Sequence, residues 1–311
     1  MIRQSGNQES LSDPATPLPD CINGASSVEA FLARLRLYWP LTKSLQTGLL
    51  LSTGLAGYMS ARCPVMHWYD FIGLGISLFM AIAGSTILNM WYDRDIDSVM
   101  NRTHHRPLAD GRVPPDEALR FGLILSALGV GLAAAMSPMY GLIVFAGLFF
   151  DVVVYTLWLK RRTCWSIVWG GVSGGMPILA GRAFGLGHVD GIGILLSLAV
   201  LFWIPTHILT FWMRYFDEYQ AARIPTFPST YGFVATRVTI AISSIIAALS
   251  IGFAGVLIGV EWGFVRLLAV LSAGLLLLAI ASIFRPSERV NFVLFKYASL
   301  YMLSAMVLLS I

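Results

Sequence analysis

The sequence predicts an all-α membrane protein with nine transmembrane helices around a central cavity. Of its 311 residues, 57% are hydrophobic and only 12% are charged, whereas water-soluble domains carry about 25% charged residues. The chain also divides into apolar windows of the length, about 20 residues, that a helix needs to cross the hydrocarbon core of a membrane. The third observation is the distribution of Lys and Arg between alternate connections, which agrees with nine spans.

The apolar windows, in order, are 41–61, 70–90, 118–136, 139–159, 165–186, 191–212, 238–259, 263–284 and 291–311. If the N-terminus is cytoplasmic, all of the 21 Lys and Arg residues except Arg62, Arg182 and Arg266 fall on the cytoplasmic side. Cytoplasmic loops are enriched in these residues, and one span more or fewer would destroy the asymmetry. The net charge of +4 therefore reflects membrane topology, and we expect no nucleic-acid partner.

The N-terminal region differs in composition from the rest. Residues 1–28 are polar and rich in Pro and Ser, and they lack the apolar segment of a signal peptide. We expect a disordered cytoplasmic tail over residues 1–36 and a multi-pass transmembrane domain over residues 37–311, in the cell membrane and in contact with the lipid bilayer. Cys21, Cys63 and Cys164 match no metal-binding pattern.

A cluster of charged residues follows the second window, in NMWYDRDIDSVMNRTHHRP at residues 89–107. Asn89, Asp93 and Asp97 recur every four residues and so share one helix face, about 6 Å apart. Carboxylate and amide oxygens suit Mg²⁺, which also binds phosphate oxygens, and Arg102 and Arg106 add phosphate-binding groups. We predict a metal and phosphate site here; the alternative is a basic cytoplasmic loop with solvated acids.

A second acidic pair, Asp217 and Glu218, follows the sixth window on the same side of the membrane. The two clusters can therefore face one cavity and hold Mg²⁺ ions that neutralise a departing diphosphate. Lys160 and Arg161, in the KRR run after the fourth window, lie on that side too. Taken alone, such a run is also what any cytoplasmic membrane anchor contains.

The stretch NMWYDRDIDSVMNRTHHRPL resembles the first aspartate-rich motif of the UbiA superfamily of intramembrane prenyltransferases, whose pattern is NxxxDxxxD followed by RTxxRPL. The resemblance extends from about Tyr38 to the C-terminus. Within the superfamily, YTLWLKRRT, WIPTH and FDEYQAARIP are most similar to the heme O synthase branch.

This resemblance implies a Mg²⁺-dependent enzyme that ionises farnesyl or another prenyl diphosphate. The 2-vinyl group of the acceptor, heme B, would attack the resulting cation, and water would complete heme O. The metal ligands would be Asn89, Asp93, Asp97, Asp217 and Glu218. Asp93, Asp97 and His207 would be catalytic. The diphosphate contacts would be Lys43, Arg102, Arg106, Lys160 and Arg161.

His207 matches the histidine of a PPH motif in that branch, although this chain has PTH. It would face heme or handle a proton; a hydrogen bond between helices is the alternative. Asp151 lies about two and a half turns before Lys160, well inside the membrane, where a charged carboxylate is costly. We expect Asp151 to be neutral or hydrogen-bonded and to face the cavity, with a simple interhelical hydrogen bond as the alternative.

The chain departs from the branch pattern near the acceptor. Ser44 follows Lys43 where proline is usual, and GGVSGGMPILAGRAFG lacks a double proline. Two other functions therefore stay open: prenylation of an aromatic quinone precursor or a polar lipid, and transport. Met213 and Arg214 stand where quinone-type enzymes carry the first Asp of a DxxxD motif. Transporters place ionisable residues near the membrane midplane, whereas here they gather at the cytoplasmic ends.

Overall fold

The computed structural model describes residues 27–62 and 67–311, and no strand occurs among these residues. Residues Tyr38–Ile311 form one compact unit, and Met1–Leu37 form a separate one. The predicted disordered tail lies outside the described residues as far as residue 26. Residues 27–36 are instead part of helix α1 (Ser27–Tyr38), whose sequence SVEAFLARLRLY repeats apolar residues at helical spacing.

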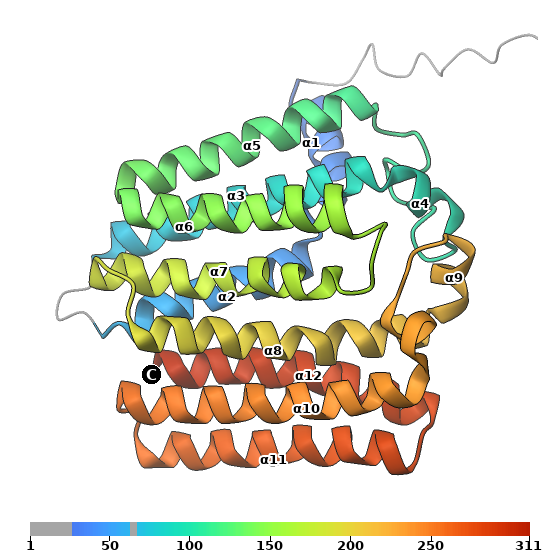
Figure 1. Ribbon diagram of the computed structural model, residues 1–311. Coiled ribbons are helices and arrows are strands. Elements are labelled where there is room, and N and C mark those ends of the chain that lie inside the picture. Colours follow the sequence, from blue (N-terminus) through green and yellow to red (C-terminus); the bar gives the residue numbers. More distant parts are fainter. Residues whose placement is uncertain (1–26, 63–66) are drawn as a thin grey trace, which may run out of the picture. The chain divides into compact units, whose positions relative to one another are not determined.

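The remaining elements follow one another through mostly short connections, with a longer one over residues 100–114 between α4 and α5 (Figure 1). They are η1 (Trp39–Thr42), α2 (Ser44–Ser60), α3 (Trp68–Tyr92), α4 (Arg94–Val99), α5 (Pro115–Met136), α6 (Pro138–Phe149), the π-helix η2 (Phe150–Leu159), α7 (Ser166–Leu186), α8 (Gly191–Arg214), α9 (Phe216–Ala221), α10 (Phe227–Ile258), α11 (Trp262–Phe284) and α12 (Glu288–Ser310). The long helices run side by side, and the short helices α4 and α9 lie together at one end.

Seven helices in the described part of the chain are long and apolar enough to cross a membrane: α3, α5, α6 together with η2, α8, α10, α11 and α12. The other two predicted windows, 41–61 and 165–186, are also helical, as α2 and α7. However, α2 has only 17 residues and α7 is rich in glycine. The all-helical membrane fold is confirmed, whereas the count of nine spans stays a prediction.

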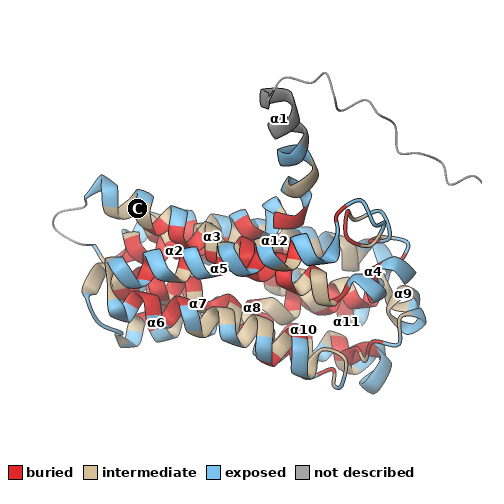
Figure 2. Cartoon of the chain, turned by 90° about the horizontal axis from the view of Figure 1, so that it is seen from above, coloured by how far each residue is buried: buried red, intermediate tan, exposed pale blue. Residues whose placement is uncertain are grey.

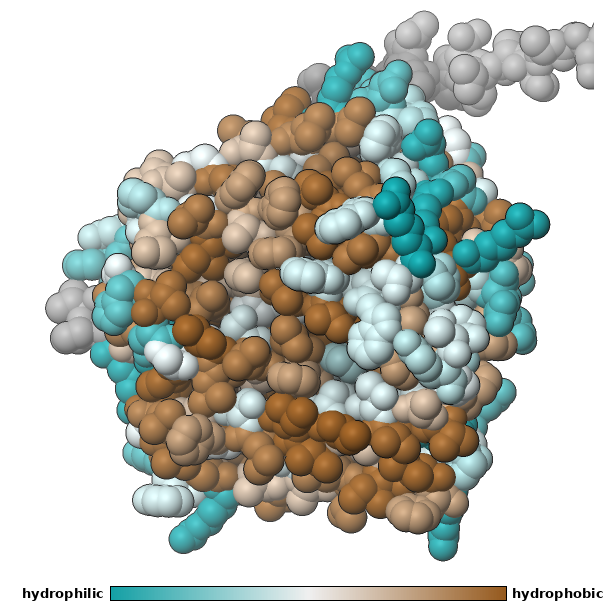
Figure 3. Space-filling model, viewed as in Figure 1, coloured by the Kyte–Doolittle hydropathy of each residue, from teal (hydrophilic) through white to brown (hydrophobic). Residues whose placement is uncertain are grey.

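The surface of the helices suits a lipid environment. Leu249, Val270 and Leu277 are exposed on α10 and α11, and apolar side chains cover most of the face in Figure 3, with hydrophilic ones towards the helix ends. Buried residues gather between the helices (Figure 2). A soluble protein rarely exposes so much contiguous apolar surface, so these outward faces are expected to contact lipid.

Glycine explains how α2 and α7 pack. A Cβ atom added to Gly57 would lie 2.1 Å from the carbonyl oxygen of Ile178, and one added to Gly181 would lie 1.9 Å from that of Gly54. Any larger residue would push the two backbones apart, as in other membrane helix pairs that use small residues at the interface. This contact holds α2, which begins just after Lys43, against the centre of the bundle.

A buried ion pair joins three helices at the end away from α4 and α9. Arg182 of α7 donates hydrogen bonds to both carboxylate oxygens of Asp190, each 2.8 Å long, and to the carbonyl oxygen of Ser60 at 2.6 Å. The hydrogen bonds from Arg182 lower the pKa of Asp190. The ends of α2 and α7 and the start of α8 are thereby linked.

Candidate active site

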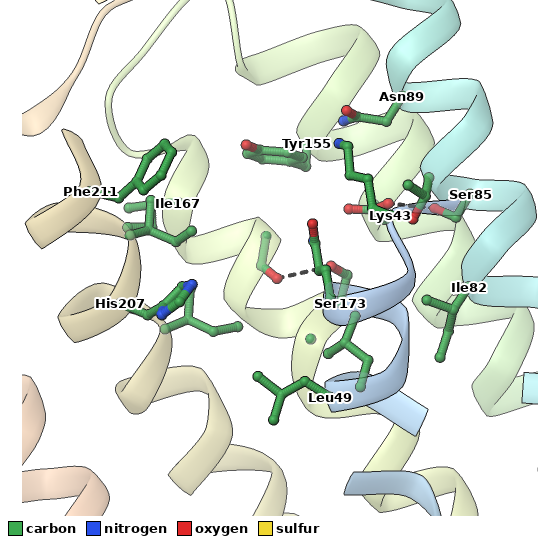
Figure 4. Close-up of a pocket in the computed structure, with 18 of the residues that line it drawn as sticks. Lys43, Leu49, Ile82, Ser85, Asn89, Tyr155, Ile167, Ser173, His207 and Phe211 are labelled. Atoms are coloured by element: carbon green, nitrogen blue, oxygen red, sulfur yellow. Dashed lines mark hydrogen bonds between the residues drawn. The ribbon is translucent and has the colours of Figure 1, made fainter. Parts of the chain in front are cut away.

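A cavity of about 780 Å³ opens among α2, α3, α4, α6, η2, α7, α8, α9 and α12. Eight of the predicted site residues line it: Lys43, Asn89, Asp93, Asp97, Arg102, Arg106, Lys160 and His207. Apart from His207, these polar residues come from the end where α3 meets α4, and the rest of the wall is mostly apolar, with residues such as Leu49, Ile82 and Ile167 (Figure 4). The cavity is therefore polar at one end and apolar beyond it.

The acidic motif keeps its helical spacing across a break between two helices. Helix α3 ends at Tyr92 and α4 begins at Arg94, so Asp93 lies at the junction. The backbone hydrogen bonds from Asp93 to Asn89 (3.0 Å) and from Asp97 to Asp93 (2.8 Å) nevertheless continue the helical pattern. As a result, Asn89, Asp93 and Asp97 all line the cavity.

Both motif aspartates are buried and paired with a cation. Lys160 donates a hydrogen bond to Asp93 Oδ2, and Arg106 Nη1 lies 2.7 Å from Asp97 Oδ2. Burying a carboxylate is costly unless a cation or hydrogen bonds compensate it. These ion pairs therefore compensate the burial of the two carboxylates on the cavity wall, next to the cations that a diphosphate would use.

Two oxygen atoms of the motif remain open to a further ligand. Asp93 Oδ1 is buried and has no hydrogen-bond partner among the described residues; Arg161 Nη2 is 3.9 Å away. The amide nitrogen of Asn89 donates to Thr156 Oγ1 at 2.8 Å, which leaves the amide oxygen of Asn89 available. Carboxylate and amide oxygens are the ligands that Mg²⁺ prefers, so this donor set fits the predicted ion.

Two cations on the cavity wall have no carboxylate partner in the described part of the chain. One is Lys43, whose backbone is left-handed (φ 44°, ψ 60°) between η1 and α2, a conformation that costs a non-glycine residue about 1–2 kcal/mol. Its side chain points towards Asn89 and Tyr155 in Figure 4. The other is Arg102, whose guanidinium lies over the rings of Phe211 (4.7 Å) and Tyr215 (5.5 Å).

The unpaired cations make this end of the cavity suited to an anion. The Nε atom of Arg102 is buried without a hydrogen-bond partner in residues 27–62 and 67–311. A buried, unpaired cation is unfavourable by several kcal/mol, and a ligand with several anionic oxygens would relieve it, as phosphate groups do when arginine binds them. A diphosphate has that chemistry.

The π-helix η2 aligns two residues that an α-helix would separate. Lys160 N–H donates to the carbonyl oxygen of Tyr155 at 2.8 Å, five residues earlier. In an α-helix, side chains five residues apart point in directions that differ by about 140°, whereas here Tyr155 and Lys160 both line the cavity, with the ammonium 5.6 Å from the ring. Tyr155 is not among the predicted site residues, because nothing in the apolar window 139–159 distinguishes a π-helix from an α-helix.

Arg161 is a predicted diphosphate contact, but it does not line the cavity. Its guanidinium donates to both oxygens of Asp95, at 2.7 and 2.8 Å, and to the carbonyl oxygen of Tyr92 at 2.7 Å. These hydrogen bonds lower the pKa of Asp95. Successive side chains point in different directions, so the cavity receives Lys160 while Arg161 fastens the outer side of the α3–α4 junction.

Asp217 and Glu218 are likewise not brought to the cavity wall. Both lie in α9, where Asp217 is exposed and Glu218 accepts a 3.2 Å hydrogen bond from the backbone N–H of Arg102. Tyr219 is the α9 residue that lines the cavity, and a residue two positions earlier on a helix points about 160° away from it. Accordingly, no three His, Cys, Asp or Glu side chains in the described residues are grouped to hold one metal ion.

His207 lies on the side of the cavity formed by α8, across from Asn89 and Ser85 of α3 (Figure 4). Its ring is stacked between Trp203 and Phe295, with centroid distances of 5.2 and 4.6 Å. Its Nδ1 atom is 3.2 Å from Ser299 Oγ. The ring is therefore held in a defined orientation on the apolar side of the cavity.

Asp151 forms a hydrogen bond between helices and also lines the cavity. Ser85 of α3 donates to Asp151 Oδ2, and both residues belong to the cavity wall. As expected, Asp151 is hydrogen-bonded and faces the cavity, and its hydrogen bond also joins two helices.

Comparison with known proteins identifies the fold and the family. The model of the UbiA prenyltransferase family matches residues 50–302. A digeranylgeranylglyceryl phosphate synthase structure superposes with a TM-score of 0.74 at 17% identity, covering 89% of this chain and 98% of that one. A UbiA homolog from Archaeoglobus fulgidus bound to GPP and Mg²⁺ gives a TM-score of 0.63 at 17% identity, covering 89% and 99%.

Similar sequences carry a more specific name. The protoheme IX farnesyltransferase of Archaeoglobus fulgidus is 43% identical over 204 residues, which are 65% of this chain and 70% of that protein. The protoheme IX farnesyltransferase of Desulforudis audaxviator is 36% identical over 279 residues, 86% of this chain and 85% of that protein. The resemblance predicted from the motifs is confirmed, and transport is excluded as the alternative: this chain belongs to the UbiA prenyltransferase family.

Proposed function

We propose that this chain transfers a farnesyl group from farnesyl diphosphate to a vinyl group of heme B, in a Mg²⁺-dependent reaction that gives heme O. The observation that carries the proposal is one cavity with open oxygen ligands and unpaired cations at one end and an apolar wall beyond. The similarity to proteins named protoheme IX farnesyltransferase, at 36–43% identity, supports heme as the acceptor.

The polar end would bind the diphosphate. Lys43 and Arg102 are available to phosphate oxygens. Lys160 and Arg106 are each hydrogen-bonded to a carboxylate, and they can exchange that hydrogen bond for one to phosphate. Asn89, Asp93 and Asp97 would hold Mg²⁺, whereas Asp217 and Glu218 on α9 would need to turn towards the cavity to contribute. When bound, Mg²⁺ stabilises the charge that develops on the departing diphosphate.

The apolar wall would hold the farnesyl chain away from water. Leu49, Ile82 and Ile167 line the part of the cavity beyond the polar end. Exclusion of water prevents an allylic cation from being captured before the acceptor reaches it. His207, stacked between Trp203 and Phe295, would face the heme from the opposite side.

The bonds change as follows. The C1–O bond of farnesyl diphosphate breaks, and the diphosphate leaves with the electron pair. The terminal vinyl carbon of heme B bonds to C1, which places a positive charge on the vinyl carbon next to the pyrrole ring. Water adds to that carbon and loses a proton, which gives the hydroxyethylfarnesyl group.

The distribution of charge along the chain supports a location and an orientation in the membrane. We infer that residues 37–311 form the catalytic domain and that it is inserted in the cell membrane, with the N-terminus and the polar end of the cavity on the cytoplasmic side. Support comes from the placement of all Lys and Arg residues except Arg62, Arg182 and Arg266. Labelling single cysteines at residues 104 and 188 from outside intact cells tests this topology, because only residue 188 should react.

The decisive experiment incubates the purified protein with Mg²⁺, farnesyl diphosphate and heme B and follows the products by mass spectrometry. The expected product is heme O, absent when Mg²⁺ is chelated. Parallel reactions offer a quinone precursor, 4-hydroxybenzoate, and a polar lipid acceptor, geranylgeranylglyceryl phosphate. Prenylation of either of these with heme left unchanged would overturn the choice of acceptor.

A further inference from the structure

Asp151 is a carboxylate inside a predicted membrane span that the proposed chemistry has not yet used. It lies near the start of η2, it is half-buried, and it lines the same cavity as Asp93 and Lys160. An acidic side chain at membrane depth is costly, and such residues usually serve a binding or proton-transfer role.

The contacts of Asp151 leave one oxygen atom open. Ser85 Oγ donates a hydrogen bond to Oδ2. The structure gives Oδ1 no hydrogen-bond partner in residues 27–62 and 67–311, and because Asp151 is only half-buried, this oxygen is accessible from the cavity. A carboxylate oxygen beside a serine hydroxyl can bind one water molecule through two polar partners.

Asp151 differs from Asp93 and Asp97, the carboxylates of the acidic motif, in forming no ion pair within the described part of the chain. Asp93 is paired with Lys160 and Asp97 with Arg106, whereas Asp151 forms no ion pair with the described residues. Of these three carboxylates, Asp151 is therefore the one engaged neither by an ion pair nor by the predicted metal site, which leaves it available to a water molecule in the cavity.

The position of Asp151 suits the last step of the proposed reaction. It comes one turn of the π-helix before Tyr155, which in turn precedes Lys160 at the polar end. Its partner Ser85 lies beside Lys43 in Figure 4, on the same helix as Asn89. Asp151 thus lines the cavity just beyond the predicted diphosphate contacts, where the carbon released from diphosphate would be expected to meet the acceptor.

We propose that Asp151, positioned by Ser85, is the general base that deprotonates the water molecule added to heme after the farnesyl group has been attached. This inference rests on the proposed function. The water oxygen bonds to the cationic vinyl carbon while one water proton passes to Asp151 Oδ1, so that charge and atoms balance. Without this base, the cation loses a proton from the adjacent carbon and forms a double bond.

The test compares the products of the wild-type protein and of Asp151→Asn by mass spectrometry, with Mg²⁺, farnesyl diphosphate and heme B. The wild type should give the hydroxylated product and incorporate ¹⁸O from labelled water. Asp151→Asn should still release diphosphate and farnesylate heme, but its main product should be lighter by one water molecule. The ratio of hydroxylated to dehydrated product should fall about 100-fold or more, the usual contribution of a general base.

Three further variants control the test. Asp151→Glu keeps the carboxylate and should restore a measurable fraction of hydroxylated product. Ser85→Ala keeps Asp151 but removes its orienting hydrogen bond, and should lower the ratio less than Asp151→Asn does. Ser173→Ala removes another hydroxyl of the cavity wall, one that donates only to the carbonyl oxygen of Gly170 at 2.9 Å, and should leave the ratio unchanged.

The outcomes separate this inference from the proposed function. If the wild type makes heme O and Asp151→Asn makes the same product in the same ratio, Asp151 is not the base and the proposed function stands. His207→Gln is assayed in parallel, and the same conclusion follows if that variant, and not Asp151→Asn, gives the dehydrated product. If Asp151→Asn loses diphosphate release and farnesylation together while Asp151→Glu does so too, the role is structural. A wild type that leaves heme unprenylated overturns both proposals.

Discussion

Buried charges occur at both ends of the helices, and the two clusters differ in how completely they are paired. Around Arg182, the guanidinium is matched by both oxygens of Asp190 and by Ser60. In the cavity, Asp93 Oδ1 and Arg102 Nε are buried without hydrogen-bond partners among the described residues, and Lys43 has no ion pair there. A complete pair stabilises the fold, whereas an incomplete set leaves groups for a ligand.

The largest effect should come from the acidic motif. Asp93→Asn keeps the size of the side chain but removes the negative charge that holds Lys160 and faces the cavity. We expect kcat/KM for farnesyl transfer to fall about 1000-fold, the loss seen when a main electrostatic contact to the transition state is removed. The variant should still elute as a folded protein in detergent. Activity within about tenfold of wild type would show that Asp93 holds no ion in the reaction.

The matched change at the other end is Arg182→Met. It leaves Asp190 and the Ser60 carbonyl without their partner, and breaking a buried ion pair in this way costs about 3 kcal/mol. Thermal unfolding in detergent should therefore begin at a lower temperature than in the wild type, while the activity per folded molecule is retained. Lost activity in protein of unchanged stability would contradict the division between the two clusters.

The pH dependence of this pair follows from the lowered pKa of Asp190. A carboxyl group whose pKa is lower in the folded state stabilises the protein above its unfolded pKa, about 3.9, and loses that contribution as the pH falls through the folded value. The difference in unfolding temperature between wild type and Asp190→Asn should thus be constant between about pH 7 and 5 and shrink below about pH 4. If the difference in unfolding temperature shrank between pH 7 and 5, the pH dependence would have to come from a group other than Asp190.

Lys43 and Arg161 provide a comparison within the polar end. Both are predicted diphosphate contacts, but only Lys43 lines the cavity. Lys43→Met should lower kcat/KM for farnesyl diphosphate about 100-fold, within the range for a charged hydrogen bond to phosphate. Arg161→Met should lower it less than about tenfold. Equal losses would mean that both residues reach the substrate.

The smallest effect should come from Asp95, which is largely exposed and paired with Arg161. Exposed ion pairs contribute at most about 1 kcal/mol to stability. Asp95→Asn should leave farnesyl transfer within about twofold of wild type and shift the unfolding temperature slightly. A loss as large as that of Asp93→Asn would show that the total charge at this junction matters more than which carboxylate faces the cavity.

The features predictable from the sequence are those with a local period. Apolar windows follow from helix length and membrane thickness, and the four-residue spacing of Asn89, Asp93 and Asp97 places these residues on one side even across the break at Asp93. The motif match was also sufficient to place the chain in its family. In each case the physical cause acts within a few helical turns.

The features that could not be predicted from the sequence depend on how helices are rotated and distorted by their neighbours. Spacing alone could not show that α9 directs Tyr219 to the cavity in place of Asp217, or that Arg161 binds Asp95. The π-helix that aligns Tyr155 with Lys160 could not be predicted from the sequence either. The composition and periods of the chain thus determine that it is a helical membrane protein with a metal and phosphate motif. The packing of helices distant in sequence decides which charges face the cavity, because a rotation of one helix by one residue redirects every side chain on it.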